Sequence, residues 1–577
     1  MALKKDEYII DLRNEDNLDK KTKLRLKKIC NENINEFAKL INKVSINLTN
    51  NIDWWVSSPS NRNNLTSDLY LRYCKTKLIY EINKRKKIDK IIVDTNNFKK
   101  VLIQIIGNKK IIVKKRNFLF TRLYFFLKFI FLQLVRRLLQ LIACRMSKTK
   151  DMNYHKRKLT LIDTYVLPGF YSKDRYYNGM WEKLNLKEKK SIFFISSITY
   201  TKIRNGFNLI GNIYNVYLEL RKSKRPFIIK EDYIYISDVL YAVFFSIRSK
   251  FIKIPNIIYK EINYKPLIID DLNNLNNHTL SIEGILNYRF IKNINNKSLK
   301  INLFIDWWEN QAVDKGFHMA LNKYYPKSDV KGYLGYVPRN FEMQLYPTEF
   351  EIKSGVVPKK IVVIGKSVIK IVKKLYSNLN VKIAPAFRYN YLWESSRRKS
   401  DKSFYNIVIA LPINYDDSII MIKKILNIKF LKSQDFRLFI KPHPTMNTYQ
   451  IKRSLNISKF DNIYFSNEET KAIIKTSNLL ISSMSIVALE SISLGTPVLL
   501  IKRESILDFN PIPDEIDKRL WHKCLSTTEI KNSILFFKNH ANLNKHKNMI
   551  KISYKVKKNF FSKITNNNVL NFLNIKR

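Results

Sequence analysis

Short apolar runs separated by polar, helix-like segments fill the last third of the chain. Residues 436–502 contain four such runs: FRLFI, NIYF, NLLIS and TPVLLI. Strands that alternate with helical segments are typical of βαβ units, whose strands form a parallel sheet. The pattern therefore predicts a Rossmann-like α/β domain over residues 396–577.

A similar alternation precedes this domain. Apolar runs that predict strands lie at residues 91–95, 101–107, 159–170, 191–200, 301–310, 359–366 and 381–387. The polar segment 391–404 separates the two series, and residues 1–90 are polar, basic and mostly helical in pattern. We expect an N-terminal helical region (1–90), a first Rossmann-like domain (91–395) and a second one (396–577), with the two domains facing a cleft.

One long apolar segment departs from this alternation. Residues 118–144 read FLFTRLYFFLKFIFLQLVRRLLQLIAC, and cations interrupt every stretch before the roughly 20 apolar residues that a spanning helix needs. On a helix, its polar side chains Arg122, Gln133, Arg136, Arg137 and Gln140 fall on one side. The pattern fits a basic amphipathic helix in a membrane interface, and equally a core helix with a polar stripe.

Two unusual polar clusters follow predicted strands of the second domain. They are the sequences KPHP at 441–444 and SSMS at 482–485. Carboxyl ends of parallel strands meet at one edge of a sheet, which is where such sheets bind ligands. A histidine and a lysine can bind phosphate oxygens, and serines at a helix start suit an anion. We therefore predict a phosphate site made of Lys441, His443, Pro444, Ser482, Ser483 and Ser485.

The order of these motifs resembles the donor-binding half of GT-B glycosyltransferases. A strand ending in KPHP, a strand ending in SS-x-S and the helix ALESISLGTPV are most similar to bacterial enzymes of the sialyltransferase and Kdo-transferase type. The resemblance implies a CMP-activated acidic sugar as donor, held by the HP motif (His443, Pro444) and the serine motif. It places Glu490 near the donor ribose or sugar, and it implies a C-terminal helix that crosses back to the first domain.

The donor stays open, because the KPHP turn is also similar to polyol-phosphate transferases of the teichoic-acid type. A looser resemblance extends over residues 309–365. As a whole the chain is similar to bacterial surface-carbohydrate biosynthesis proteins, which make capsule polysaccharide or lipopolysaccharide. This resemblance implies a glycan or lipid-linked acceptor.

A candidate base lies in the segment DWWENQAVDKGF, residues 306–317. An inverting transfer needs a group that takes the proton of the acceptor hydroxyl. Glu309 is our candidate, since it follows a predicted strand and adjoins tryptophans that could raise its pKa or stack on a sugar. His443 is expected to stabilise the departing phosphate. Fallback bases are Asp306, Asp314, His318 and Glu349, and the candidate acceptor contacts are Trp308, Gln344, Glu349, Asp163 and Arg175.

The net charge of the chain suggests a second class of function, the binding of anions. The 577 residues carry a formal net charge of +56, with the cations scattered along the chain. The excess of Lys, Asn and Ile suggests codon bias, and no RNA-binding or zinc-finger pattern is present, so we expect no nucleic-acid partner. Such a field would still attract anionic lipids and anionic sugars, and a non-enzymatic anion-binding protein stays an alternative.

Several motifs are missing from the sequence. It contains no DxD motif, no P-loop and no GxGxxG, so we expect a metal-independent transferase with no cofactor beyond the nucleotide-sugar co-substrate. The four cysteines are far apart, and the N-terminus lacks an apolar signal region. We expect a cytoplasmic glycosyltransferase, peripheral to the inner membrane face. A GT-B-fold epimerase or a polyol-phosphate transferase would use the same nucleotide site.

Overall fold

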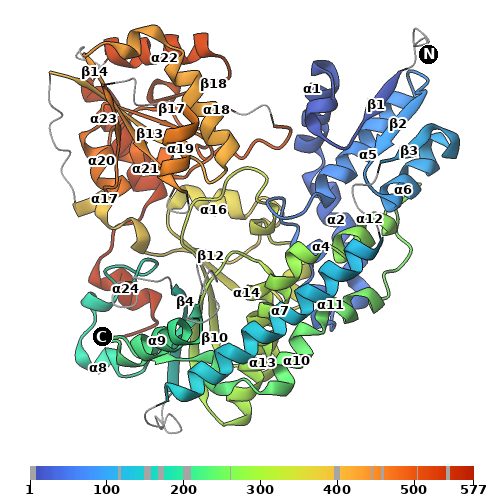
Figure 1. The fold of residues 1–577 in the computed structure, drawn as a ribbon. Helices are drawn as coiled ribbons and strands as arrows, with labels where there is room; N and C mark the ends of the chain where they lie inside the picture. Colours follow the sequence, from blue (N-terminus) through green and yellow to red (C-terminus); the bar gives the residue numbers. More distant parts are fainter. Residues whose placement is uncertain are drawn as a thin grey trace.

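The structure is a computed structural model of the chain. It describes residues 8–114, 119–148, 158–166, 174–198, 209–259, 261–394, 403–443, 446–455, 461–502, 505–540 and 546–576. Figure 1 shows two α/β domains, the second (orange) above the first (green and yellow), with an N-terminal unit (blue) to the side.

The first domain is built on a parallel sheet of seven strands. Its strands are β4 (Lys158–Val166), β5 (Ile192–Ile198), β6 (Phe227–Ile228), β9 (Lys300–Trp307), β10 (Asp329–Leu334), β11 (Lys360–Val363) and β12 (Val381–Ile383). They lie in the order β12-β11-β10-β9-β4-β5-β6, and every pairing is parallel. The strand order reverses between β4 and β9, as at the ligand-binding switch point of Rossmann folds.

The second domain has a six-stranded parallel sheet with the same kind of order. Its strands are β13 (Tyr405–Ala410), β14 (Phe436–Lys441), β15 (Ile463–Phe465), β16 (Leu479–Ser482), β17 (Val498–Ile501) and β18 (Trp521–Cys524). They lie in the order β15-β14-β13-β16-β17-β18. Strands β13, β16 and β17 are buried along their whole length, as expected for a sheet covered on both faces. The predicted fold class, two Rossmann-like domains of the GT-B type, is confirmed.

The N-terminal unit combines helices with a small parallel sheet. The helices include α1 (Lys20–Glu32), α2 (Ile34–Ser45), α5 (Leu69–Asn83) and α6 (Asn96–Ile106), and β1 (Ile9–Asp11) pairs with β2 (Lys90–Val93), which pairs with β3 (Ile111–Val113). The strand predicted at 101–107 is wrong. Thr95 caps α6 by accepting a hydrogen bond from Phe98 N, and Phe98, Val101 and Leu102 bury one face of that helix.

The C-terminal end of the chain returns to the first domain, as the resemblance implied. After α23 (His546–Phe560), the helix α24 (Asn566–Phe572) packs beside β10. Lys331 Nζ donates to the carbonyl oxygen of Phe572 at 2.6 Å, and the Phe572 ring lies 5.3 Å from that of Tyr333. The two domains are therefore joined both by the linker near residue 394 and by this returning helix.

Two helices beneath the first sheet cross at glycines. They are α13 (His278–Asn296) and α14 (Ala312–Tyr324). A Cβ atom on Gly316 would lie 1.9 Å from the carbonyl oxygen of Gly284, so only glycine permits this approach. Helix α14 begins three residues after Glu309. The close crossing of α13 and α14 therefore fixes the start of the helix that follows this candidate base.

Among the described residues, no helix is both long and apolar enough to cross a membrane. The four cysteines are buried and free.

Candidate functional site at the domain junction

The histidine turn of the second domain lies where expected, at a strand end. Strand β14 ends at Lys441, and His443 follows as a partly buried residue whose carbonyl oxygen accepts from Met446 N at 2.8 Å. Burial lowers the pKa of His443, and the positive charge of Arg175 lowers it further. His443 therefore faces a residue of the first domain. Pro444 lies outside the described residues.

The serine turn lies at the same edge of the sheet. Strands β14 and β16 both pair with β13, so their ends are about two strand spacings, or ~10 Å, apart. Ser482 ends β16 with its Oγ buried and without a hydrogen-bond partner among the described residues. Ser483 and Ser485 are partly exposed, and Ser485 Oγ accepts from Val487 N at 3.4 Å, at the start of α21 (Val487–Ser493).

The first domain reaches this serine turn directly. Arg339 Nη1 donates to the carbonyl oxygen of Met484 at 3.2 Å. The same guanidinium pairs with Glu342 at 2.7 Å, and the Glu342 carboxylate is almost fully buried. This contact holds the serine turn against the segment that follows β10.

Two arginines converge on the junction without a carboxylate partner. Neither Arg175 nor Arg388, which lies in the short helix η10 (Phe387–Tyr389), forms an ion pair or hydrogen bond with any described residue. Partial burial lowers the pKa of Arg175, and neighbouring Arg388 lowers it further. Burial also acts to lower the pKa of Arg388, but Tyr389, Glu490 and other acidic neighbours raise it overall. The pair is a concentrated positive charge.

Glu490 links the second domain to the linker. It lies in α21 and accepts a short hydrogen bond from the hydroxyl of Tyr391, which begins α17 (Tyr391–Glu394). Burial raises the pKa of Glu490, while Tyr391, Arg388 and Arg175 act in the opposite direction. The carboxylate therefore lies within electrostatic reach of both arginines.

Glu309 lies in a tight turn after β9. Asn310 adopts a left-handed backbone with φ of 51°, which asparagine tolerates better than most residues. Asp314 Oδ2 accepts from the backbone N–H groups of Glu309 and Gln311, each at 2.9 Å. These bonds fix the turn and leave the Glu309 side chain partly exposed.

The Glu309 carboxylate is held from both sides. Trp307 Nε1 donates to one oxygen at 3.1 Å, and Gln311 Nε2 donates to the other at 2.7 Å. Burial raises the pKa of Glu309 and the carboxylate of Glu342 raises it further, whereas the two hydrogen bonds and Arg388 lower it. A raised pKa suits a general base.

Other predicted site residues are buried. Trp308 is completely buried beneath Gly332, and Asp163 is buried within β4, which continues three residues beyond it. The acceptor contacts expected of Trp308 and Asp163 stay predictions. Gln344 is also buried, and its carbonyl oxygen accepts from Asn310 at 2.8 Å, so it supports the Glu309 turn.

The fallback bases are also placed elsewhere. Asp306 and His318 form a buried pair at 2.7 Å, and Asp314 is buried as the cap of α14. Glu349 lies on the surface, paired with Lys353 at 2.7 Å. Of these carboxylates, Glu309 is the one that joins the junction.

Sequence reasoning missed Arg388, Tyr391 and Arg339. All three lie in irregular segments or short helices between strands, where no periodicity marks them. One signal was available, because the stretch AFRYNYLWE after β12 gathers arginine and aromatic side chains directly beyond a strand end.

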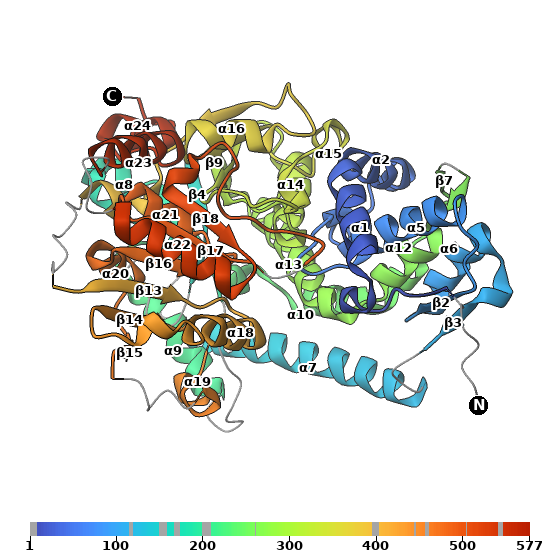
Figure 2. The same ribbon diagram turned by 90° about the horizontal axis from the view of Figure 1, so that it is seen from above.

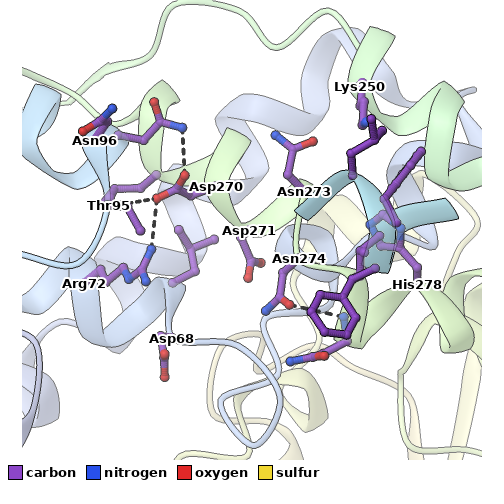
Figure 3. Close-up of a pocket in the computed structure, with 18 residues that line it drawn as sticks. Asp68, Arg72, Thr95, Asn96, Lys250, Asp270, Asp271, Asn273, Asn274 and His278 are labelled. Atoms are coloured by element: carbon purple, nitrogen blue, oxygen red, sulfur yellow. Dashed lines mark hydrogen bonds and ion pairs between the residues drawn. The ribbon is translucent and has the colours of Figure 1, made fainter. Parts of the chain in front are cut away.

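One cavity lies away from this junction. It has a volume of about 1070 Å³ and lies between the N-terminal unit and the long helix α7 (Leu119–Met146). Figure 3 shows its polar wall, where Asp270 accepts from Arg72, Thr95 and Asn97 at 3.1, 2.5 and 2.8 Å. Several polar side chains of that wall therefore form hydrogen bonds with one another.

Across the described residues, no group of His, Cys, Asp and Glu side chains could hold a metal ion.

No family model and no curated protein matches this chain. Solved structures match weakly. The S. aureus MnaA–UDP structure has a TM-score of 0.40 at 11% identity and covers 73% of this chain and 98% of its own. UDP-GlcNAc 2-epimerase from Neisseria meningitidis bound to UDP-GlcNAc has a TM-score of 0.38 at 13% identity, with coverage of 69% and 98%. In the GtfA/B complex the TM-score is 0.34 at 9% identity, and the match covers 51% of this chain and 60% of the other.

Proposed function

We propose that this chain is a glycosyltransferase whose nucleotide-sugar donor binds at the domain junction. The observation that supports it is the pair Arg175 and Arg388, two guanidiniums without an ion pair among the described residues, near the strand ends that hold His443 and Ser482. Positive charge that Glu490 offsets only in part, at the carboxyl edge of a parallel sheet, suits an anionic ligand. A nucleotide phosphate fits that chemistry.

The proposed donor site uses groups from both domains. Phosphate oxygens would accept from His443, from the serine hydroxyls and from the arginines, and Lys441 would add charge. The unpartnered hydroxyl of Ser482 supports this role, since a buried polar group without a partner costs stability unless a ligand satisfies it. Glu490 would accept from hydroxyl groups of the ribose or the sugar.

The proposed reaction is a direct displacement. Glu309 takes the proton of the acceptor hydroxyl, whose oxygen attacks the anomeric carbon as the bond from that carbon to the phosphate oxygen breaks. The leaving phosphate keeps the electron pair, and Arg175, Arg388 and His443 stabilise its charge. Attack from the face opposite to the phosphate inverts the anomeric configuration.

For the donor we propose a CMP-linked acidic sugar. Such a donor carries a phosphate and a carboxylate, and these two anionic groups would match two unpaired guanidiniums. A UDP-sugar, whose diphosphate also carries two charges, is the competing donor. The proposed acceptor is a surface glycan or a lipid-linked saccharide.

The donor site can be tested by thermal shift. We expect CMP or a CMP-sugar to raise the melting temperature, because a ligand that binds only the folded state stabilises it. His443→Ala and Arg388→Met should each weaken nucleotide binding roughly 10- to 100-fold, the loss expected for one charge-assisted hydrogen bond. A matched control is Arg519→Met. The Arg519 side chain is 62% exposed, and its charge interacts with Asp517.

The outcomes separate the alternatives. A shift with UDP or GDP alone would keep the site and reject the CMP donor. Equal shifts in the wild type and in both variants would contradict the site. Product analysis with a labelled nucleotide sugar then distinguishes the enzymes, because a transferase releases the nucleotide and labels an acceptor, whereas an epimerase returns an altered nucleotide sugar.

A further inference from the structure

Helix α7 packs with its polar side toward the protein. Gln133, Arg137 and Gln140 are buried. Arg137 pairs with Glu283 of α13 at 2.7 Å and donates to Gln140 at 3.1 Å, and Gln133 donates to Thr279 at 3.2 Å. The predicted polar stripe is thus the attachment of the helix to the first domain.

The apolar side of α7 consequently points away from the protein. Figure 2 shows the helix along the outer edge of the molecule. Six large apolar side chains in its first half are exposed, with Phe131 at 63%: Leu123, Tyr124, Phe125, Leu127, Phe131 and Leu132. The core-helix interpretation does not describe this first half, whereas the second half of α7 does bury Leu141, Ala143 and Cys144 in the core. Leu123 and Phe125 line the cavity between α7 and the N-terminal unit, so these two side chains face that unit, and Tyr124, Leu127, Phe131 and Leu132 form the outward apolar surface.

Neighbouring helices extend this apolar surface. α10 (Ile236–Val243) packs against α7 and leads into α11 (Phe245–Arg248). Their exposed side chains recur every three or four residues on one side and continue to Phe251, which is 76% exposed: Ile236, Leu240, Phe244, Ile247 and Phe251. We call these residues, with Tyr124, Leu127, Phe131 and Leu132 of α7, the α7 face. Exposed apolar side chains gathered on packed neighbouring helices are typical of an interaction site.

The exposed charges on α7 and on the segment after α11 are positive, whereas the acidic residues near the start of α7, Asp68, Asp270 and Asp271, line the cavity between that helix and the N-terminal unit. Helix α7 contains no Asp or Glu over its 28 residues. Lys128, Arg145, Lys250 and Lys253 are exposed, and the one acidic residue of α10, Asp238, is buried. Exposed apolar side chains flanked by cations match the interface of a bilayer with anionic lipids.

We propose that the α7 face docks this protein on the surface of an anionic lipid bilayer. The helix lies in the interface with its apolar side among the acyl chains near the headgroups, while its buried polar stripe stays bound to the first domain. At 1.5 Å per residue, the exposed apolar residues of α7 from Tyr124 to Leu132 would contact the bilayer over roughly 12 Å. This docking is independent of the proposed transfer reaction, although it would bring the enzyme to lipid-linked acceptors.

Vesicle flotation of the full chain tests the docking. The probes are vesicles of phosphatidylcholine alone and of phosphatidylcholine with an equal part of phosphatidylglycerol. We expect the wild type to float with the anionic vesicles only, and added salt to weaken binding. The double variant Leu127→Glu/Phe131→Glu should bind at least roughly tenfold more weakly, because it removes two apolar contacts and adds negative charge. Leu186→Glu, at an 80% exposed leucine of α8 (Leu186–Lys189), is the matched control.

Three results would overturn the proposal. One is a wild type that ignores anionic vesicles, and another is equal binding by the wild type and the double variant. The third is a wild type that self-associates in light scattering and does not float, with the double variant monomeric, since the α7 face would then join two copies. An unchanged melting temperature of the double variant, with and without nucleotide, separates a docking defect from misfolding and from a failure of the donor site.

Discussion

Glu309→Gln should lower the rate of sugar transfer by roughly 10²- to 10⁴-fold, the contribution expected of a general base. The change keeps the shape of the side chain, and its one remaining oxygen can still accept from either Trp307 or Gln311. It removes the negative charge that would take the proton of the acceptor. Nucleotide binding should persist, because His443 and Ser482 of the second domain are unchanged.

The measurement is the initial rate with the donor found by thermal shift and a matching acceptor glycan. Glu349→Gln is the comparison, since Glu349 is the other carboxylate that the sequence offered as a base. The structure pairs it with Lys353 on the surface, and we expect near wild-type rates. A Glu309→Gln protein that keeps its full rate, or a Glu349→Gln protein that loses it, would remove Glu309 from the mechanism.

The pH dependence gives a second readout of the same group. A base works only when deprotonated, so kcat/KM should fall as the pH drops through the pKa of Glu309. Burial raises that pKa above the ordinary glutamate value of 4.5, and the acid limb should therefore lie above pH 4.5. The limb should vanish from the residual activity of Glu309→Gln. A wild-type acid limb at or below 4.5 would contradict the assignment.

The parts of the fold that the sequence predicts are those with local signals. Strands such as 479–482 and 498–501 are nearly continuous apolar runs because a parallel sheet buries both of its faces. The segment 101–107 has a similar composition but forms part of α6, since the Thr95 cap and the sheet pairing of β2 with β3 decide its structure. Apolar content alone does not separate a short strand from a buried helix.

The candidate site also contains residues that the sequence predicts and residues that it does not. His443 and Ser482 were predictable, because strand ends of one sheet meet at one edge. The approach of Arg175 to Arg388 depends on how a loop after β4 and a segment after β12 come together, which no spacing in the sequence encodes. For α7, the sequence shows the polar stripe but not which side faces the protein. The partly buried carboxylate of Glu283 decides which side packs inward, and it lies on a helix more than 130 residues further along the chain.

Glu351→Gln should destabilise the protein by about 3–5 kcal/mol, the cost of breaking a buried ion pair from one side. Glu351 lies in α15 (Glu349–Lys353) and pairs with Arg62 at 2.6 Å and with Lys315 of α14 at 3.3 Å. The three side chains are at most 2% exposed. The cluster joins the N-terminal unit, through Arg62, to the first Rossmann-like domain.

The glutamine would leave two buried cations without a counter-charge. Burial, together with the nearby charge of Arg62, lowers the pKa of Lys315 to about 8 despite the carboxylate of Glu351, so the charged form of Lys315 depends on that carboxylate. Arg62 also holds a left-handed backbone with φ of 54°, which its bond to Glu351 helps to maintain. Removal of the carboxylate should therefore loosen the contact between the N-terminal unit and the domain that carries Glu309.

Urea unfolding at pH 7 measures the effect, and Glu349→Gln in the same helix is the control. The Glu349–Lys353 pair is similarly short, at 2.7 Å, but its side chains are 52% and 74% exposed, so its loss should cost about 0–1 kcal/mol. The stabilisation by Glu351 should also depend on pH. Burial acts to raise the pKa of Glu351, but Arg62 and Lys315 lower it to about 2, from an ordinary value of 4.5. The unfolded chain therefore takes up a proton first, and the stabilisation by Glu351 is present above pH 4.5 and lost as the pH falls toward 2. The difference in the free energy of unfolding between wild type and Glu351→Gln should shrink over that range. An equal loss of stability in Glu351→Gln and Glu349→Gln, or a loss that does not depend on pH, would contradict the prediction. It would show that burial does not determine how much the ion pairs of Glu351 stabilise the protein.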